Sequence, residues 1–255
     1  MTRVIKVGGR PQSDPSLAAA LAAAHRASPG SVIVVHGGGD EVSTLQRLYG
    51  VDARFRGGRR VTSRVDLDII RMALSGSANK RLVSALVSAG IPALGLSGED
   101  AALLSAQPLD PVQYGFVGTP DTVNVALLRF LMTGEYMPVL SPVSHSADSS
   151  LSLLLNVNGD DAAARIAVAL NADELLLVSD VVGVMVHGAA LGALVPEEAQ
   201  RLIDDGTAHG GMAAKLQAAL AALEGGVERV RISDIAAIEQ LDRGTLLTRV
   251  GSVCA

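Results

Sequence analysis

The sequence predicts an α/β fold built around a mainly parallel β-sheet. Residues 3–7 and 31–35 are short, mainly apolar segments of strand length, which is typical of buried strands. Between them, Leu17, Ala20 and Leu21 recur at helical spacing. A strand, a helix and a second strand within about thirty residues form a βαβ unit, whose strands run parallel. The same alternation continues along the chain, so helices are expected to pack on the sheet throughout.

The first half of the chain carries recognisable helix boundaries. Asp14 and Pro15 are the expected cap and first residue of the first helix, which Pro29-Gly30 ends. Ser63 and Asp66 form a capping-box pattern ahead of another helix. The segments expected after it are a helix at 79–89, a strand at 91–96, a helix at 122–132 and a strand at 138–140.

The second half repeats this alternation. A polar, serine-rich segment at 144–150 is interpreted as a loop, with a hairpin, near a boundary between two lobes. We expect one domain over residues 1–255, with an N-terminal lobe to about residue 150 and a C-terminal lobe from about residue 151. The segments expected in the second lobe are helices at 160–170, 196–204 and 211–223 and strands at 174–178 and 227–232.

The composition restricts the classes of partner. The formal net charge is −5, which disfavours nucleic acid and anionic membranes. Cys254 is the single cysteine, so no intrachain disulfide forms and no cysteine–histidine metal site is expected. The chain shows no signal peptide and no apolar run long enough to cross a bilayer, so a cytoplasmic protein is expected.

Two glycine-rich turns are the strongest local signals of ligand binding. Gly37, Gly38 and Gly39 follow the second apolar strand, and Gly8 and Gly9 follow the first. Glycine lets the backbone approach a ligand, and successive N–H groups at a helix N-terminus bind anions. In a parallel sheet both turns lie at the carboxyl edge, where ligands bind. Together they predict a phosphate cradle, although either turn alone is also explained as a tight connection that needs glycine.

Lys6 stands at the end of the otherwise apolar first strand. It either reaches the predicted cradle or is a strand-end lysine whose ammonium group extends to water. No Walker A string and no protein-kinase catalytic motif occurs. A phosphate-transferring function therefore requires another scaffold.

Nine short strings form one ordered pattern along nearly the whole chain. They are Lys6-x-Gly8-Gly9, His36-Gly37-Gly38-Gly39, Gly58-Arg59-Arg60-Val61-Thr62, Asn79-Lys80, Gly95-Leu96-Ser97-Gly98, Gly115-x-Val117-Gly118, Asn156-Val157-Asn158-Gly159-Asp160, Ser179-Asp180-Val181-Val182-Gly183 and Gly210-Gly211-Met212-x-x-Lys215. The pattern resembles the amino-acid-kinase family, and within it the enzymes that phosphorylate N-acetylglutamate. The resemblance implies a three-layer αβα sandwich whose N-terminal lobe binds the amino acid and whose C-terminal lobe binds the nucleotide.

The resemblance implies a catalytic set of Lys6, Asp160 and Lys215. The two lysines would hold and neutralise the transferring phosphoryl group, because phosphoryl transfer depends mainly on positioning and charge stabilisation. Asp160 would orient both lysines and need not act as a base, because a substrate carboxylate at about pH 7 has no proton to remove. Asp160 is also placed to cap the following helix, and the adjacent Asp161 is the less favoured alternative.

The resemblance also implies binding residues. Gly38 and Gly39 would bind the substrate through their N–H groups, and Arg60 and Asn156 would clamp its α-carboxylate, with the arginine supplying a bidentate fork. ATP would bring Mg²⁺, held mainly by phosphate oxygens. The phosphates and the nucleotide would lie against Gly8, Gly9, Ser179, Asp180, Gly183, His209, Gly211 and Met212.

Three residues near these positions have structural interpretations. His36 is interpreted as structural and not as an acid or base. Asn158 is either a turn residue or part of the site. Arg59, which stands where the family usually has leucine, is interpreted as a solvated neighbour.

The implied reaction transfers the γ-phosphoryl group of ATP to the side-chain carboxylate of N-acetyl-L-glutamate, in arginine biosynthesis. N-succinylglutamate or carrier-linked aminoadipate is the alternative substrate, and Arg56, Arg59 and Arg64 would offer the extra cation that succinyl requires. An inactive ligand sensor is the alternative of another class, which the retained catalytic set disfavours. Arginine-sensitive hexameric relatives carry a helix ahead of the first strand, which here begins within the first residues, so a homodimer without arginine feedback is expected.

Overall fold

The computed structural model describes residues 1–148 and 153–249, in which strands and helices alternate along the chain. The strands are β1 (Arg3–Val7), β2 (Val32–His36), β3 (Arg54–Arg56), β4 (Arg59–Val61), β5 (Ala93–Gly98), β6 (Leu104–Pro108), β7 (Val117–Val123), β8 (Met137–Ser146), β9 (Leu154–Val157), β10 (Glu174–Val178), β11 (Met185–Val186), β12 (Ala189–Ala190), β13 (Ala193–Leu194), β14 (Arg229–Ser233) and β15 (Thr245–Leu247). The α-helices are α1 (Ser16–Ala27), α2 (Gly39–Leu48), α3 (Arg64–Arg71), α4 (Asn79–Ser88), α5 (Pro111–Tyr114), α6 (Val125–Thr133), α7 (Gly159–Leu170), α8 (Pro196–Asp204) and α9 (Gly210–Glu224).

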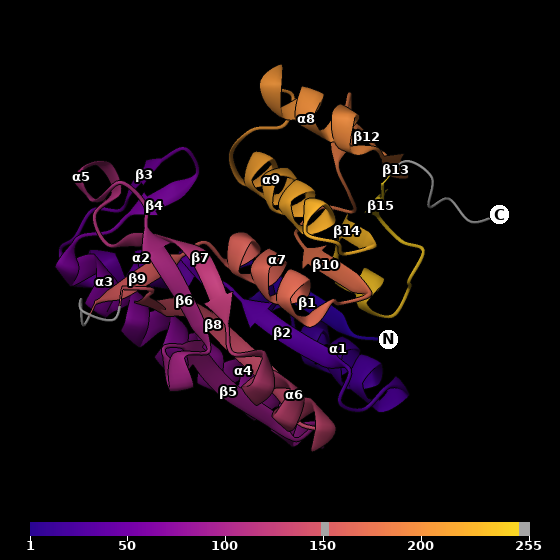
Figure 1. Cartoon of the computed structure of the whole chain (residues 1–255), viewed down its shortest axis with the longest axis horizontal. Helices are drawn as coiled ribbons and strands as arrows, with labels where there is room; N and C mark the ends of the chain where they lie inside the picture. Colours follow the sequence, from indigo (N-terminus) through magenta and orange to yellow (C-terminus); the bar gives the residue numbers. More distant parts are fainter. Residues whose placement is uncertain (149–152, 250–255) are drawn as a thin grey trace.

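One large sheet runs through the molecule (Figure 1). Its strand order is β13-β15-β14-β10-β1-β2-β8-β6-β7-β9, with β5 also paired to β8. Every pairing from β14 through β10, β1, β2 and β8 to β5 is parallel. Antiparallel pairs occur toward the margins, at β14–β15, β6–β7 and β8–β9. The prediction of a mainly parallel central sheet is therefore confirmed.

Helices cover both faces of this sheet and make three layers. Because successive strand residues point to opposite faces, Val4 of β1 joins the core beneath α7 and α9, whereas Ile5 and Val7 join the core beneath α1 and α4. Most side chains in both cores are Ala, Val, Leu or Ile, as expected for a chain without tryptophan. None of the helices in the described ranges is long and apolar enough to cross a membrane.

Most helix boundaries agree closely with the sequence patterns. The helix predicted from residue 122 instead begins at Val125, because Thr122 and Val123 belong to β7. Ser63 and Asp66 form the predicted capping box at the start of α3, and α8 has the predicted bounds. Helix α3 continues through a π-helical stretch, Met72–Ala78, into α4. The first helix begins one residue after the predicted Pro15, although the Asp14 carboxylate still accepts a hydrogen bond from the Ser16 N–H at 2.8 Å.

The predicted loop at 144–150 is partly wrong. Strand β8 continues through Ser146 and pairs with β9 in antiparallel register, so the hairpin is confirmed but its first residues are strand. Pairing explains the difference, because β6 and β9 satisfy the backbone groups of this polar segment. Residues 149–150 of the predicted loop lie outside the described residues.

Candidate active site

The two glycine-rich turns meet at the carboxyl ends of β1 and β2. The Gly37 N–H donates to the Val7 carbonyl oxygen at 3.0 Å. A methyl group added at Gly9 would lie 3.3 Å from the Gly39 nitrogen, so the turns approach each other closely. Gly38 has φ +152°, which favours glycine. Since Gly38 and Gly39 begin α2, their region holds N–H groups without intrahelical partners, as an anion cradle requires.

Lys6, Asp160 and Lys215 form a buried ionic cluster beside these turns. The Lys6 Nζ lies 2.8 Å from Oδ1 of Asp160, and the Lys215 Nζ lies 3.3 Å from both carboxylate oxygens. The alternation of β1 turns Lys6 toward α7, whose first turn carries Asp160; Lys215 comes from the second turn of α9. The side chains of the three residues are thus brought together from widely separated parts of the chain.

The cluster carries more positive than negative charge. Two ammonium groups face one carboxylate, which leaves about one unit of positive charge available to an anion. Burial alone would raise the pKa of the Asp160 carboxyl, but Lys6 and Lys215 outweigh it and the pKa is lowered. Burial, assisted by the nearby Lys6 ammonium, lowers the pKa of Lys215. Asp160 is accordingly a carboxylate anion held between two cations, and it has no proton to donate.

Asn158 holds Asp160 at the start of its helix. Its side-chain oxygen accepts a hydrogen bond from the Asp160 N–H at 2.8 Å, which is an N-cap. The cap is therefore Asn158 and not Asp160, so the Asp160 carboxylate remains available to the lysines. His36 is fully buried, and burial lowers its pKa to about 4. Its ring contacts the Asn79 side chain at 3.0 Å, which agrees with a structural interpretation.

Arg60 is fixed at the edge of the cradle by several acceptors. Its guanidinium donates to the Gly39 carbonyl oxygen at 3.1 Å and to the Ser43 hydroxyl at 2.9 Å. It also donates to Gln46 and lies 4.6 Å from the centre of the Phe55 ring. These contacts hold the fork in one orientation, which suits recognition of a carboxylate.

Two adjacent cavities open around the cluster. The first, about 210 Å³, lies beside the hairpin of β3 and β4 and is called the hairpin cavity. Its lining residues, predicted for the substrate, include Gly38, Arg60, Asn156 and Asp160. The loop cavity, about 400 Å³, is lined by residues that include Gly8, Ser179, Asp180, Gly211, Met212 and Lys215. Lys6, Gly9 and Gly39 line both. The cluster thus lies where two molecules held in the two cavities would meet, the larger cavity being the one predicted for the nucleotide.

Two predicted nucleotide residues lie apart from this lining. Gly183 packs on β15, where an added methyl group would lie 2.6 Å from the Thr245 hydroxyl oxygen. His209 occupies the N-cap position of α9 and is exposed. Among the described residues, neither lines the hairpin cavity or the loop cavity, so their roles stay predictions. Gly8 lines the loop cavity. Its N–H already donates to the Val178 carbonyl oxygen at 3.2 Å, so this group is paired within the protein.

The structure adds two arginines that sequence reasoning missed or dismissed. Arg10 lines the loop cavity and pairs with Asp180 at 2.6 Å; the signal was a cation directly after the first glycine turn. Arg59 is not a solvated neighbour, because it lines the hairpin cavity and pairs with Asp161 at 2.6 Å. Nothing local in the sequence indicates the ion pair between Arg59 and Asp161.

The chain is similar to known proteins over most of its length. A family model described as amino acid kinase family matches residues 1–234. An acetylglutamate kinase from Chloroflexus aurantiacus (strain ATCC 29366 / DSM 635 / J-10-fl) is 42% identical over 247 residues, covering 96% of each chain. One from Geobacillus stearothermophilus is 39% identical over 233 residues, covering 91% of this chain and 89% of that relative.

Solved structures share the fold of this chain. A protein from Streptococcus mutans UA159 superposes with a TM-score of 0.87 at 29% identity, covering 97% of this chain and 98% of the other. A carbamate kinase from Giardia superposes with a TM-score of 0.74 at 16% identity over 97% of this chain and 98% of the other, which shows a shared fold. The family match and the relatives thus define a small-molecule kinase. The chain belongs to the amino acid kinase family, and the predicted family and fold are confirmed.

Proposed function

We propose that this protein transfers the γ-phosphoryl group of ATP to the side-chain carboxylate of N-acetyl-L-glutamate, giving N-acetylglutamyl 5-phosphate. The observation that carries the proposal is the Lys6–Asp160–Lys215 cluster at the junction of the two cavities. The acetylglutamate kinases at 42% and 39% identity support this choice of substrate. An inactive ligand sensor would have no need for this cluster.

The chemistry requires no general base. A carboxylate oxygen of the substrate forms a bond to the γ-phosphorus while the bond from that phosphorus to the β–γ bridging oxygen breaks, and ADP leaves with the electron pair. Lys6 and Lys215 would neutralise the charge on the transferring group, held in place by Asp160. Gly9, Gly38 and Gly39 would add backbone N–H groups.

The choice of acetyl over succinyl rests on the arginines near the clamp. An extra succinyl carboxylate would need its own cation, but Arg59 pairs with Asp161 at 2.6 Å and Arg56 donates to Gln113. Arg64 lies 6.0 Å from the centre of the Phe116 ring. Arg59, the cation next to the clamp in sequence, is therefore already neutralised by Asp161, which favours a small uncharged acyl group.

Narrower predictions belong to the same proposal. The N-terminal lobe, to about residue 150, would bind the amino acid, and the C-terminal lobe would bind the nucleotide, in keeping with the two cavities. Mg²⁺ would accompany ATP, bound mainly to phosphate oxygens. Action in arginine biosynthesis is in line with the names of the relatives. A cytoplasmic location and a homodimeric state complete the proposal.

The test is ADP release with ATP, Mg²⁺ and each of three acceptors under identical conditions: N-acetylglutamate, N-succinylglutamate and free glutamate. We expect the highest kcat/KM for N-acetylglutamate, and little activity with free glutamate because its ammonium group would be poorly accommodated. A tenfold preference for N-succinylglutamate, about 1.4 kcal/mol, would overturn the acetyl assignment. No ADP release with any acceptor would overturn the kinase itself.

A further inference from the structure

We propose that the ion pair between Arg59 and Asp161 is a positioning device that fixes the substrate clamp relative to the catalytic carboxylate. The inference rests on the proposed function and deepens it. Arg59 directly precedes Arg60, the clamp residue, and Asp161 directly follows Asp160. One contact therefore links the two halves of the site through their sequence neighbours.

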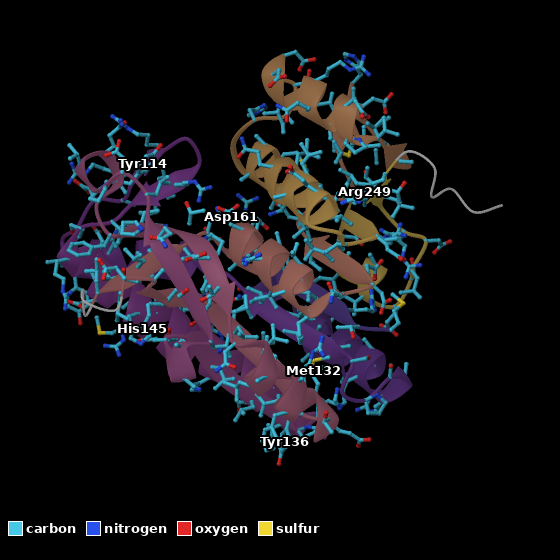
Figure 2. All side chains as sticks on the ribbon, in the orientation of Figure 1. Tyr114, Met132, Tyr136, His145, Asp161 and Arg249 are labelled. Atoms are coloured by element: carbon cyan, nitrogen blue, oxygen red, sulfur yellow. The ribbon has the colours of Figure 1, made fainter. Side chains whose placement is uncertain are left out.

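The geometry of this pair is close and sheltered. The Arg59 Nη1 lies 2.6 Å from Oδ2 of Asp161, and the two side chains are only 25% and 17% exposed. Figure 2 shows Asp161 at the start of α7, where the N-terminal and C-terminal halves of the molecule face each other. An ion pair sheltered from solvent is screened less by salt than an exposed one, so it holds its geometry better.

The hairpin of β3 and β4 depends on this pair for its polar contact with α7. The side-chain hydrogen bonds of the hairpin in the described structure go to the N-terminal half. Arg56 donates to Gln113, and Arg60 donates to Gly39, Ser43 and Gln46. Both hairpin strands are short, and β3 is exposed. Without Arg59, the clamp would keep its contacts on one side and lose the contact that fixes it to α7.

A third cavity makes this loss difficult to repair. The α7–α9 cavity, about 520 Å³, is lined by Arg59, Thr119, Asp161, Arg165, Val168 and Gln217, among others. Arg59 also lines the hairpin cavity, so its side chain borders both spaces. Shortening that side chain would enlarge the open space beside the hairpin.

The experiment is a double-mutant cycle with Arg59→Leu, Asp161→Asn and the double variant, measuring kcat, KM for N-acetylglutamate, KM for ATP and Tm. Each single variant should lower kcat/KM for N-acetylglutamate about tenfold, with both kcat and KM affected, and the double variant should lose about as much as either single one. KM for ATP should stay within about twofold of wild type, because the pair does not line the loop cavity.

Two controls separate positioning from general stability. Arg59→Lys keeps the charge and should restore part of the lost kcat/KM, even if Arg59→Leu folds poorly. The matched pair is Arg243 with Asp234, also at 2.6 Å, with side chains 38% and 25% exposed. Because neither lines the hairpin cavity or the loop cavity, Arg243→Leu should lower Tm and leave kcat and both KM values unchanged.

The outcomes have distinct meanings. Losses that multiply in the double variant, or wild-type kcat and KM alongside a lowered Tm, would overturn the positioning role while the kinase assignment survives. The activity of the wild-type protein with N-acetylglutamate is measured before that of the variants. A wild type that releases no ADP with N-acetylglutamate would overturn the proposed function, and the positioning role with it.

Discussion

Strand β1 carries an ionic cluster at each end, and in both clusters one carboxylate lies between two cations. At the carboxyl end, Asp160 lies between Lys6 and Lys215, which are 4%, 7% and 8% exposed. At the amino end, Glu174 lies between Arg3 and Arg231, which are 2%, 8% and 6% exposed. Burial and charge are therefore matched, and neither distinguishes a catalytic cluster from a structural one.

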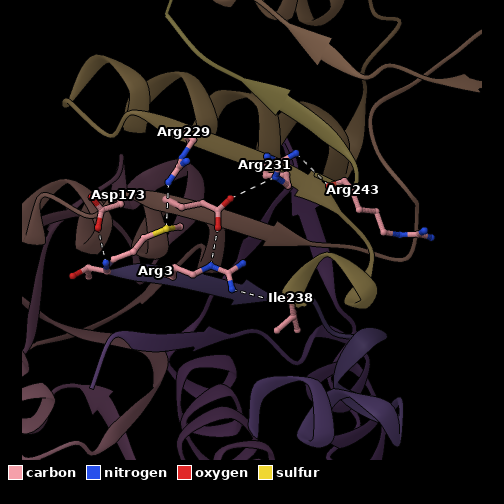
Figure 3. A network of polar contacts seen from close by, with 9 residues as sticks. Arg3, Asp173, Arg229, Arg231, Ile238 and Arg243 are labelled. Atoms are coloured by element: carbon pink, nitrogen blue, oxygen red, sulfur yellow. Dashed lines mark hydrogen bonds and ion pairs between the residues drawn. The ribbon is translucent and has the colours of Figure 1, made fainter. Parts of the chain in front are cut away.

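The difference lies in what else the cations contact. In the arginine cluster, Arg3 donates to the Ile238 carbonyl oxygen at 2.9 Å and Arg231 to that of Arg243 at 3.4 Å (Figure 3). The lysines instead line the cavities at the carboxyl edge of the parallel strands, which is where ligands bind in such sheets. The arginine cluster joins β1, β10 and the C-terminal segment, whereas the lysine cluster keeps positive charge available.

The largest predicted effect separates the clusters by turnover. Lys215→Ala or Lys6→Ala should lower kcat by on the order of 10²–10³, because each lysine would contact charge that develops during transfer. Substrate KM values should change far less. Steady-state kinetics measures both parameters, with Lys80→Ala, an exposed lysine, as the control. A near-normal kcat would remove that lysine from the mechanism.

The converse effect should appear at the amino end. Glu174→Gln leaves two buried arginines without their carboxylate, so we expect the free energy of unfolding to fall by roughly 3 kcal/mol. The kcat of the folded variant should stay within about twofold of wild type, since the cluster lines neither site cavity. Urea unfolding and kinetics test this, with exposed Glu228→Gln as the control. A large loss of kcat in folded protein would show that the arginine cluster is not purely structural.

A smaller predicted effect distinguishes Arg60, the proposed substrate-binding residue, from the proposed catalytic lysines. Arg60→Lys keeps the charge but loses the planar fork, so KM for N-acetylglutamate should rise by on the order of tenfold while ATP affinity changes little. Arg54→Lys, at an exposed position of the same hairpin, is the matched control. Weakened ATP binding instead would assign Arg60 to the nucleotide.

The smallest predicted effect concerns Asp160 and Asp161, adjacent carboxyl groups whose pKa values are shifted in opposite directions. The pKa of Asp160 is lowered by the lysines against the effect of burial, whereas burial raises the pKa of Asp161 despite Arg59. Besides Arg59 from β4, Lys6 from β1 lowers the Asp161 pKa and Asp160 within α7 raises it. As the pH falls, Asp161 should therefore be protonated first and its ion pair lost while Asp160 stays charged.

Profiles of kcat/KM for N-acetylglutamate against pH test this order. Asp161→Asn should show a flatter acid side than wild type, because the titrating group is absent. Arg59→Leu should show the same flatter acid side, because the ion pair whose loss produces the limb is already absent. Titration of the substrates is common to all three proteins. Identical limbs in wild type and Arg59→Leu would contradict the assignment.

The sequence by itself determined the features that depend on neighbouring residues or on strong patterns. The βαβ alternation, the Ser63–Asp66 capping box and the two glycine turns each follow from local chemistry. The position of Lys6 after an apolar strand also indicated a ligand site. Lys215 and the role of Asp160 came from the family resemblance, because nothing local joins α7 to α9.

Only the tertiary structure decided the contacts between distant segments. It shows that Arg59 pairs with Asp161 and is not simply solvated. It also shows that β8 continues through Ser146 and that Asn158 is the N-cap of α7. Each outcome depends on which groups a folded neighbour brings within a few ångströms, and charges or backbone amides can be satisfied by any nearby partner. Local propensity cannot specify that partner, because pairing across the sheet and between lobes is set by the packing of the whole chain.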